Sequence, residues 1–202
     1  RGPRGSGRVK SAAKDLGRRA LAPVARVLAA LHVSPNLITV AGLLAMALAG
    51  WLLALGRFRL AGLALLLGGL CDMLDGAVAR HNGVANPFGA FFDSTSDRLA
   101  EMLFFAGLLV YYTRLEPSTL YALLTFLAAG GSLLVSYTRA RAEGLGVDCQ
   151  VGMMERPERL VLLLLACFVG GVGLKVALWI LTPLVFLTSL QRVLHVQSRT
   201  RA

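Results

Sequence analysis

Long apolar runs dominate this chain of 202 residues and restrict what it can fold into. Hydrophobic residues make up 56% of the sequence, and its mean hydropathy of +0.66 is higher than a soluble domain of this length needs. A helix needs about 20 mostly apolar residues to cross a bilayer. Segments of that kind begin near Asn36, Leu60, Gly89, Ser118, Glu158 and Gly173. The sequence therefore predicts an all-α integral membrane protein with six transmembrane helices, the last two separated only by GGVG (170–173).

The positions of Lys and Arg predict how these helices are oriented, because basic loops stay in the cytoplasm. With the N-terminus inside, 16 of these residues fall in cytoplasmic segments and 4 in external ones, while Arg98 lies within a span. We therefore expect a multi-pass protein of the cell membrane whose termini both face the cytoplasm. The basic residues flank apolar helices, so the net charge of +10 indicates membrane lipids or anionic substrates as partners rather than nucleic acid.

The segment before the first span divides into two parts. Residues 1–15 are basic and begin with a Gly- and Arg-rich stretch that lacks apolar periodicity, which predicts disorder. Within residues 16–33, apolar side chains recur at helical spacing and basic ones lie off that stripe. The apolar positions are Leu16, Ala20, Val24, Val27, Leu28 and Leu31. This pattern predicts a juxtamembrane amphipathic helix on the inner membrane surface, with a cytoplasmic cap as the alternative. A single transmembrane domain is expected over residues 34–197, entered at Ser34-Pro35-Asn36.

Four aspartates occur in the stretch CDMLDGAVARHNGVANPFGAFFDSTSD (71–97), which follows an apolar run. They are Asp72, Asp75, Asp93 and Asp97. Each charge near a bilayer centre costs roughly 2.5–3.5 kcal/mol, so these acids need partners. The first two are three residues apart and the last two are four apart, which places each pair on one helix face. Asn82-Gly83 and Asn86-Pro87 indicate a turn between the pairs. Two antiparallel helices joined there would bring the carboxylates together near headgroup depth.

Carboxylates gathered in this way repel one another, and a bound cation relieves that repulsion. Carboxylate oxygens favour hard divalent ions such as Mg²⁺, Mn²⁺ or Ca²⁺ over Zn²⁺. Two such ions can activate a nucleophile and hold a transferring phosphoryl group. Gly76 and Ala79 leave room beside the acids for a ligand, and Arg80 can bind a phosphate through two N–H groups.

Two other interpretations of the acids remain open. Asp72 and Asp75 could pair with Arg80 and Arg98 as structural contacts between helices, or the acids could line the pathway of a divalent cation transporter. Neither explains why the acids crowd into one helical hairpin. A transporter also needs polar residues in both halves of the membrane, whereas the outer halves here are nearly all Leu, Ala, Val and Gly.

The pattern Asp72-x2-Asp75-Gly76-x2-Ala79-Arg80-x8-Gly89-x3-Asp93-x3-Asp97 resembles the signature of the CDP-alcohol phosphotransferase family at all eight fixed positions. The resemblance extends to the six-helix layout, the interfacial helix and the Pro-Asn pair at the first span. It implies a membrane enzyme, commonly a homodimer, in which an alcohol hydroxyl attacks the β-phosphorus of a CDP-linked lipid and releases CMP.

The resemblance also implies roles for individual residues. Asp72, Asp75 and Asp93 would bind two divalent ions, Mg²⁺ or Mn²⁺, while Asp97 would act as the general base and could also bind metal. Gly89 would allow close helix packing. The CDP-linked lipid would lie against Pro35, Asn36, Asp75, Gly76, Ala79 and Arg80.

Five arginines near the predicted cytoplasmic ends of the last three helices suit a phosphorylated acceptor, because guanidinium groups match phosphate oxygens. They are Arg139, Arg141, Arg156, Arg159 and Arg192. The alternative is the ordinary enrichment of basic residues on the inner side. Arg159 and Arg192 are favoured, since each lies within or at the edge of an apolar helix.

Four segments refine the resemblance towards bacterial phosphatidylinositol-phosphate synthases. They are SPNLIT, YTRARAEG, ERPERL and QRVLHV. This resemblance implies that the phosphatidyl group of CDP-diacylglycerol passes to 1D-myo-inositol 3-phosphate. A phosphatidylglycerophosphate synthase that uses glycerol 3-phosphate is the alternative.

Overall fold

The computed structural model describes residues 21–81 and 86–200, and these residues form helices without any strand. The predicted disordered segment 1–15 lies outside the described residues, as do Leu16 and Ala20. A short helix, Leu21–Ala30, comes first. It is followed by α2 (Pro35–Ala54), α3 (Phe58–His81), α4 (Pro87–Val110), the π-helix η1 (Tyr111–Leu115), α5 (Thr119–Glu143), α6 (Arg156–Val169) and α7 (Gly171–Thr200). The all-α prediction is confirmed.

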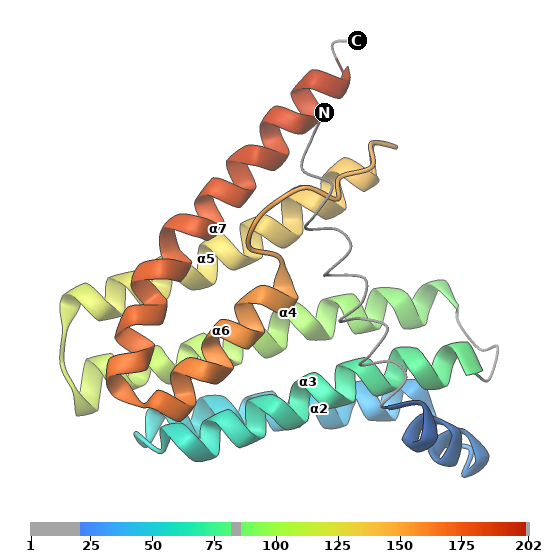
Figure 1. Ribbon diagram of the computed structural model, residues 1–202, viewed down its shortest axis with the longest axis horizontal. Coiled ribbons are helices and arrows are strands. Elements are labelled where there is room, and N and C mark those ends of the chain that lie inside the picture. The colour runs from blue at the N-terminus through green and yellow to red at the C-terminus, as the bar shows by residue number, and fades with distance from the viewer. Residues whose placement is uncertain (1–20, 82–85, 201–202) are drawn as a thin grey trace.

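The helices form a bundle in which α2, α3 and α4 lie side by side and α5 and α7 make a second group (Figure 1). The short α6 lies between the groups and packs against both α3 and α7. The start of α2, the end of α3 and the start of α4 meet at one end of the bundle (Figure 1). This end therefore carries both halves of the aspartate stretch.

Polar caps and prolines explain where several helices begin. The side chain of Ser34 accepts a hydrogen bond from the backbone N–H of Leu37 at 3.3 Å, directly before Pro35. Asn86 caps α4 in the same way, again before a proline. Such residues accept from N–H groups that have no partner within the helix, and proline suits the first helical turn. Gly170 has a φ of 99° and separates α6 from α7.

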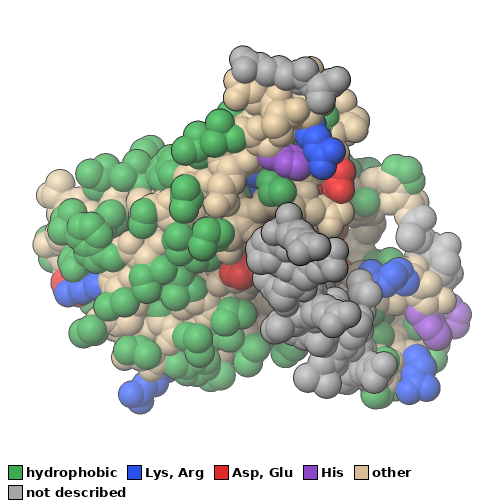
Figure 2. Space-filling view, turned by 45° about the horizontal axis from the view of Figure 1, so that its top comes forward, with side chains coloured by type: hydrophobic (Ala, Val, Ile, Leu, Met, Phe, Trp, Pro, Cys, Tyr) green, Lys and Arg blue, Asp and Glu red, His purple; other side chains and the backbone are tan. Residues whose placement is uncertain are grey.

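Within residues 21–81 and 86–200, four helices, α2, α3, α5 and α7, are long and apolar enough to cross a membrane. Hydrophobic side chains spread over much of the face seen in Figure 2. Large apolar side chains such as Trp51, Phe126 and Val172 are more than half exposed. These features are those of an integral membrane protein. The count of six spans stays a prediction, because α4 carries several charged residues and α6 has only 14 residues.

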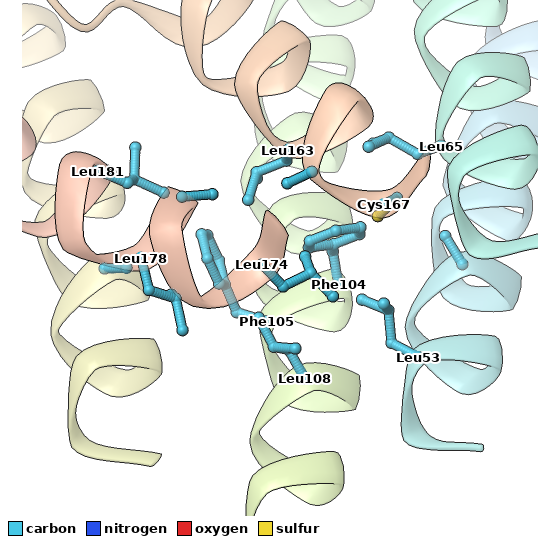
Figure 3. Packing of buried hydrophobic residues seen from close by; sticks show 14 of the residues in the cluster. Leu53, Leu65, Phe104, Phe105, Leu108, Leu163, Cys167, Leu174, Leu178 and Leu181 are labelled. Atoms are coloured by element: carbon cyan, nitrogen blue, oxygen red, sulfur yellow. The ribbon is translucent and has the colours of Figure 1, made fainter. Parts of the chain in front are cut away.

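The main core draws on all the helices from α2 to α7. Figure 3 shows Leu, Phe and Cys side chains packed within it from α2, α3, α4, α6 and α7. Next to this core, α2 and α4 touch through their backbones. A Cβ added at Gly107 would lie 1.8 Å from the carbonyl oxygen of Gly50. The absence of side chains at these two positions allows the close approach. This contact sets the position of α4, and with it the second pair of aspartates, relative to α2.

The helix Leu21–Ala30 packs on the bundle through small side chains. Ala25 and Ala29 are buried against Ile38 of α2 and Val78 of α3. Of the larger members of the predicted apolar stripe, Leu28 is partly buried against the same cluster, whereas Val24, Val27 and Leu31 are 46%, 58% and 68% exposed. Their contact with a membrane surface stays a prediction.

The opposite end of the bundle has a polar cluster of its own. Glu116, in the turn before α5, accepts hydrogen bonds from Lys175 of α7 and from the Tyr111 hydroxyl. These two hydrogen bonds, that from Lys175 first, lower the pKa of Glu116 below its ordinary value. The cluster links η1, α5 and α7 far from the aspartates.

Candidate active site

The four aspartates converge at the end of the bundle where α3 ends and α4 begins. One carboxylate oxygen each from Asp72, Asp75 and Asp93 lies within 4.8 Å of the other two. Asp97 joins them in lining a small cavity of about 20 Å³. The four acids therefore lie around one cavity, as the sequence predicts.

Neighbouring side chains contact three of the four acids. Thr39 of α2 donates a hydrogen bond to Asp75 Oδ2 at 2.7 Å. Arg156, the first residue of α6, contacts Asp72 Oδ2 with Nη1 at 2.9 Å and Asp97 Oδ1 with Nη2 at 2.7 Å. The sequence offers Arg80 and Arg98 as alternative structural partners of Asp72 and Asp75, but the guanidinium that bridges Asp72 and Asp97 belongs to Arg156 of α6.

The donor set fits a hard divalent cation. Asp93 Oδ1 is buried and has no hydrogen-bond partner among the described residues. A buried carboxylate oxygen without a partner is costly, and coordination of a cation would satisfy it. Three carboxylates at this spacing offer the oxygen ligands that Mg²⁺ and Mn²⁺ prefer.

A larger cavity of about 490 Å³ opens beside the acids. Its lining includes all six residues predicted to contact the CDP-linked lipid: Pro35, Asn36, Asp75, Gly76, Ala79 and Arg80. Thr39, Asp75 and Asp93 line both this cavity and the small acidic one. A ligand in the large cavity would therefore lie directly against the acidic cluster.

Two glycines shape this cavity. A Cβ at Gly76 would lie 3.2 Å from Arg80 Nη1, so the guanidinium lies over the bare backbone of Gly76. Gly89 also lines the cavity, and its N–H donates to the Asn86 side chain at 2.7 Å. A Cβ at Gly76 would require the Arg80 guanidinium to move by a few tenths of an ångström.

The five arginines predicted to bind the acceptor phosphate lie in different surroundings, and only Arg156 lines the acidic cavity. Arg139 is partly exposed and pairs with Glu143 at 2.8 Å. Arg141 lines a separate cavity of about 180 Å³, together with Arg192.

Arg159 and Arg192 are almost completely buried, at 0% and 2% exposed. Arg159 contacts both carboxylate oxygens of Glu101, with Nε at 2.7 Å and Nη2 at 2.9 Å. Arg192 donates to the carbonyl oxygens of Val151 at 2.8 Å and Val135 at 2.5 Å. Both arginines therefore have partners within the protein. The sequence does not predict these partners. The available signal was Glu101, an acid four residues after Asp97 in an apolar run.

A sequence model of the CDP-alcohol phosphatidyltransferase family matches residues 32–193. The chain belongs to this family. The predicted family is thereby confirmed, and with it the prediction that the protein is an enzyme, a transferase.

Two relatives in this family are named for inositol phosphate lipids. The phosphatidylinositol phosphate synthase of Mycobacteroides abscessus is 37% identical over 177 residues, covering 85% of this chain and 80% of that protein. The archaetidylinositol phosphate synthase of Pyrococcus horikoshii is 35% identical over 184 residues, covering 90% and 93%.

Solved structures of Mycobacterium tuberculosis phosphatidylinositol phosphate synthase have the same fold. The structure with CDP-DAG bound has a TM-score of 0.81 and 32% identity, covering 88% of this chain and 94% of that one. The complex with manganese and citrate has a TM-score of 0.80 and 32% identity, covering 87% and 88%.

Proposed function

We propose that the protein transfers the phosphatidyl group of CDP-diacylglycerol to 1D-myo-inositol 3-phosphate, releasing CMP and forming phosphatidylinositol phosphate. The observation that carries this proposal is the shared wall between the 490 Å³ cavity and the acidic cluster, formed by Thr39, Asp75 and Asp93. The names of the M. abscessus and P. horikoshii relatives support inositol phosphate as the acceptor. The CDP-DAG complex of the M. tuberculosis enzyme supports the donor.

The aspartates are proposed to hold two divalent ions, Mg²⁺ or Mn²⁺. Asp72, Asp75 and Asp93 would be the ligands, and Asp97, which lines the same small cavity, could also contribute. The manganese complex of the M. tuberculosis enzyme supports a divalent ion. When bound, such ions neutralise phosphate charge and stabilise the leaving group. Thr39 fixes the orientation of Asp75 through its 2.7 Å hydrogen bond.

The large cavity is proposed to take the cytidine diphosphate part of the lipid. Pro35 and Asn36 form one side of this cavity, and Gly76, Ala79 and Arg80 form another. Arg80 lies over the Gly76 backbone, where its N–H groups can bind the diphosphate oxygens.

Asp97 is proposed as the general base. It would take the proton of the acceptor hydroxyl while that oxygen forms its bond to the β-phosphorus. The bond between this phosphorus and the CMP oxygen breaks, and CMP leaves with the electron pair. Arg156 contacts Asp97 and lines the same cavity, so it is the best-placed of the five arginines for the acceptor phosphate. Arg139, Arg141, Arg159 and Arg192 remain proposed contacts, although all three nitrogens of Arg159, and Nε and Nη1 of Arg192, donate to protein groups in this structure.

The membrane arrangement is part of the proposal. All six of α2 to α7 would span the cell membrane, with both termini and the acidic end in the cytoplasm, as the distribution of Lys and Arg supports. The helix Leu21–Ala30 would lie at the inner surface, where exposed Val24, Val27 and Leu31 can enter the headgroup region. A homodimer is carried over from the family resemblance.

The acceptor assignment predicts a selective assay result. Purified protein with CDP-diacylglycerol and Mg²⁺ should release CMP strongly with inositol 3-phosphate, and weakly with free inositol, glycerol 3-phosphate or serine. A chelator should abolish release in every case. Strong release with glycerol 3-phosphate alone would instead establish the alternative acceptor. Absence of release with all four alcohols would contradict the transferase activity proposed here.

The hydrogen bond from Thr39 gives a second prediction. Thr39→Val keeps the shape of the side chain but removes the donor to Asp75. Partners of metal ligands are typically worth about 10- to 100-fold in metal affinity or activity, so Mn²⁺ affinity and CMP release should both fall by about tenfold. Thr113→Val is the matched control, because Thr113 is exposed and bonds only to carbonyls of its own helical segment, at Leu109 and Val110. Equal results for the two variants would show that the bond to Asp75 is unimportant.

A further inference from the structure

A separate cavity lies between the last turns of α5 and α7. These two helices pack along each other, and both end toward the end of the bundle where α3 ends (Figure 1). The cavity has a volume of about 180 Å³. None of its lining residues lines the small acidic cavity or the large cavity beside it. It is therefore distinct from the spaces proposed for the metal ions and for the CDP-linked lipid.

Two guanidinium groups give this cavity a positive charge that no acid in its wall offsets. Arg141 is exposed, and its guanidinium makes no hydrogen bond or ion pair with the other described residues. Arg192 is buried and donates to the carbonyl oxygens of Val151 and Val135, which carry no net charge. The described residues that line the cavity include neither Asp nor Glu. The cavity therefore attracts an anionic group, and Arg141 can bind phosphate oxygens through two N–H groups.

The rest of the wall is mostly apolar and open to the outside. Tyr137, Leu145 and Val193 line the cavity and are 62%, 56% and 54% exposed. An exposed apolar surface next to a guanidinium suits an amphipathic ligand, because each part of such a ligand finds a matching partner. Inorganic phosphate would use only the arginine and would leave the apolar wall uncovered.

The position of the cavity along the two helices matches the depth of lipid headgroups. Arg141 lies 22 residues after Thr119, where α5 begins, and Val193 lies 22 residues after Gly171, where α7 begins. At about 1.5 Å per residue, each position is about 33 Å from the start of its helix, just beyond a hydrocarbon core of about 30 Å. Basic pockets between membrane helices at this level bind anionic lipid headgroups.

We propose that this cavity binds the headgroup phosphate of an anionic membrane phospholipid through Arg141, with an acyl chain against Tyr137 and Val193. A second copy of the chain fits the cavity less well. In a two-fold contact centred here the surface meets itself, so the two Arg141 side chains would face each other with no acid in the cavity. The inference goes beyond the proposed reaction and requires only that α5 and α7, which are long and apolar enough, span a membrane.

Lipid binding by the whole protein without substrates tests this site. Native mass spectrometry from detergent compares the affinity for phosphatidylglycerol, which is anionic, with that for phosphatidylcholine, which is zwitterionic. The wild type should prefer phosphatidylglycerol by at least about fivefold, the value of one basic residue near an anionic lipid, and Arg141→Gln should lose most of this preference. An excess of inorganic phosphate should leave the lipid bound, because phosphate lacks an apolar part.

Val193→Glu and Leu194→Glu form a matched pair of variants. The two residues are neighbours on α7 and are equally exposed, at 54%, but Val193 lines this cavity whereas Leu194 lines a different one. A carboxylate at position 193 repels the lipid phosphate, so Val193→Glu should weaken phosphatidylglycerol binding by about fivefold or more. Leu194→Glu should stay within about twofold of the wild type.

Four results would overturn the proposal. Equal affinity of the wild type for the two lipids, or an equal loss in Val193→Glu and Leu194→Glu, would mean that the cavity does not select an anionic lipid. Displacement of the lipid by inorganic phosphate would mean that the ligand is free phosphate. If Arg141→Gln raised KM for inositol 3-phosphate but kept wild-type affinity for phosphatidylglycerol, Arg141 would contact the acceptor instead.

The oligomeric state and the turnover are measured separately. A wild-type dimer that dissociates upon Val193→Glu but not upon Leu194→Glu would mean that a second copy covers the cavity, and this would also overturn the proposal. CMP release by the wild-type protein tests the proposed function alone, since lipid binding in the absence of substrates does not depend on turnover.

Discussion

Asp93→Asn is expected to lower CMP release by at least about 100-fold, because even outer partners of metal ligands are worth 10- to 100-fold. Asp93 lies at the wall between the two cavities and has a buried oxygen without a partner among the described residues. Asparagine has nearly the same shape but lacks the negative charge that a divalent cation requires. Mn²⁺ binding should weaken in parallel, which electron paramagnetic resonance measures without turnover.

Asp148→Asn is the control for this variant, because Asp148 is an exposed acid outside the cluster. It should keep wild-type CMP release and wild-type Mn²⁺ affinity. If Asp93→Asn lost turnover but bound Mn²⁺ as tightly as the wild type, Asp93 would not be a metal ligand. The acid would then have another role at the wall it shares with the large cavity.

Gly107→Ala should produce the largest loss of stability. The added Cβ would lie 1.8 Å from the Gly50 carbonyl oxygen, and this neighbour is backbone that cannot rotate away. Overpacking of a tight contact costs about 1–3 kcal/mol or more, and a clash with backbone belongs at the upper end of that range. The midpoint of thermal unfolding in detergent should therefore fall, and CMP release should fall with it, since α4 carries Asp93 and Asp97.

Gly130→Ala on α5 is the matched control, because a Cβ there has no atom within 4 Å. Alanine favours a helix over glycine by about 1 kcal/mol, so this variant should be as stable as the wild type or slightly more stable. Equal midpoints for the two variants would mean that α2 and α4 do not contact each other through Gly50 and Gly107 in the protein.

The starts of the helices could be predicted, because the signals that mark them are local in the sequence. The predicted starts near Asn36, Gly89 and Ser118 lie within two residues of the observed starts at Pro35, Pro87 and Thr119. Caps and prolines mark these points in the chain itself. The length of α6 was harder to predict, because its apolar run continues into α7. The helix ends at Gly170, which has a positive φ.

The acids of the site could also be predicted, because their spacing places each pair on one face of a helix and a short turn joins the two helices. The partners of the arginines could not. Arg159 and Glu101 are 58 residues apart, and Arg192 and Val135 are 57 apart. No periodicity along the chain relates such positions, and a backbone carbonyl partner leaves no trace in the residue type. Burial of an arginine in an apolar helix therefore had two explanations, a ligand or a protein partner, and only the fold distinguishes them.

The ion pairs between α4 and α6 also bear on how the protein enters a membrane. In the proposed six-span arrangement, α4 brings four charged residues into lipid, and α6, with 14 residues at about 1.5 Å each, is shorter than a hydrocarbon core of about 30 Å. Neither helix is a good insertion segment alone, but their opposite charges neutralise each other once they meet. In that arrangement we expect α4 to become stable in the bilayer only together with α6. The contacts that place Arg156 beside the acids would then also be contacts that stabilise membrane insertion.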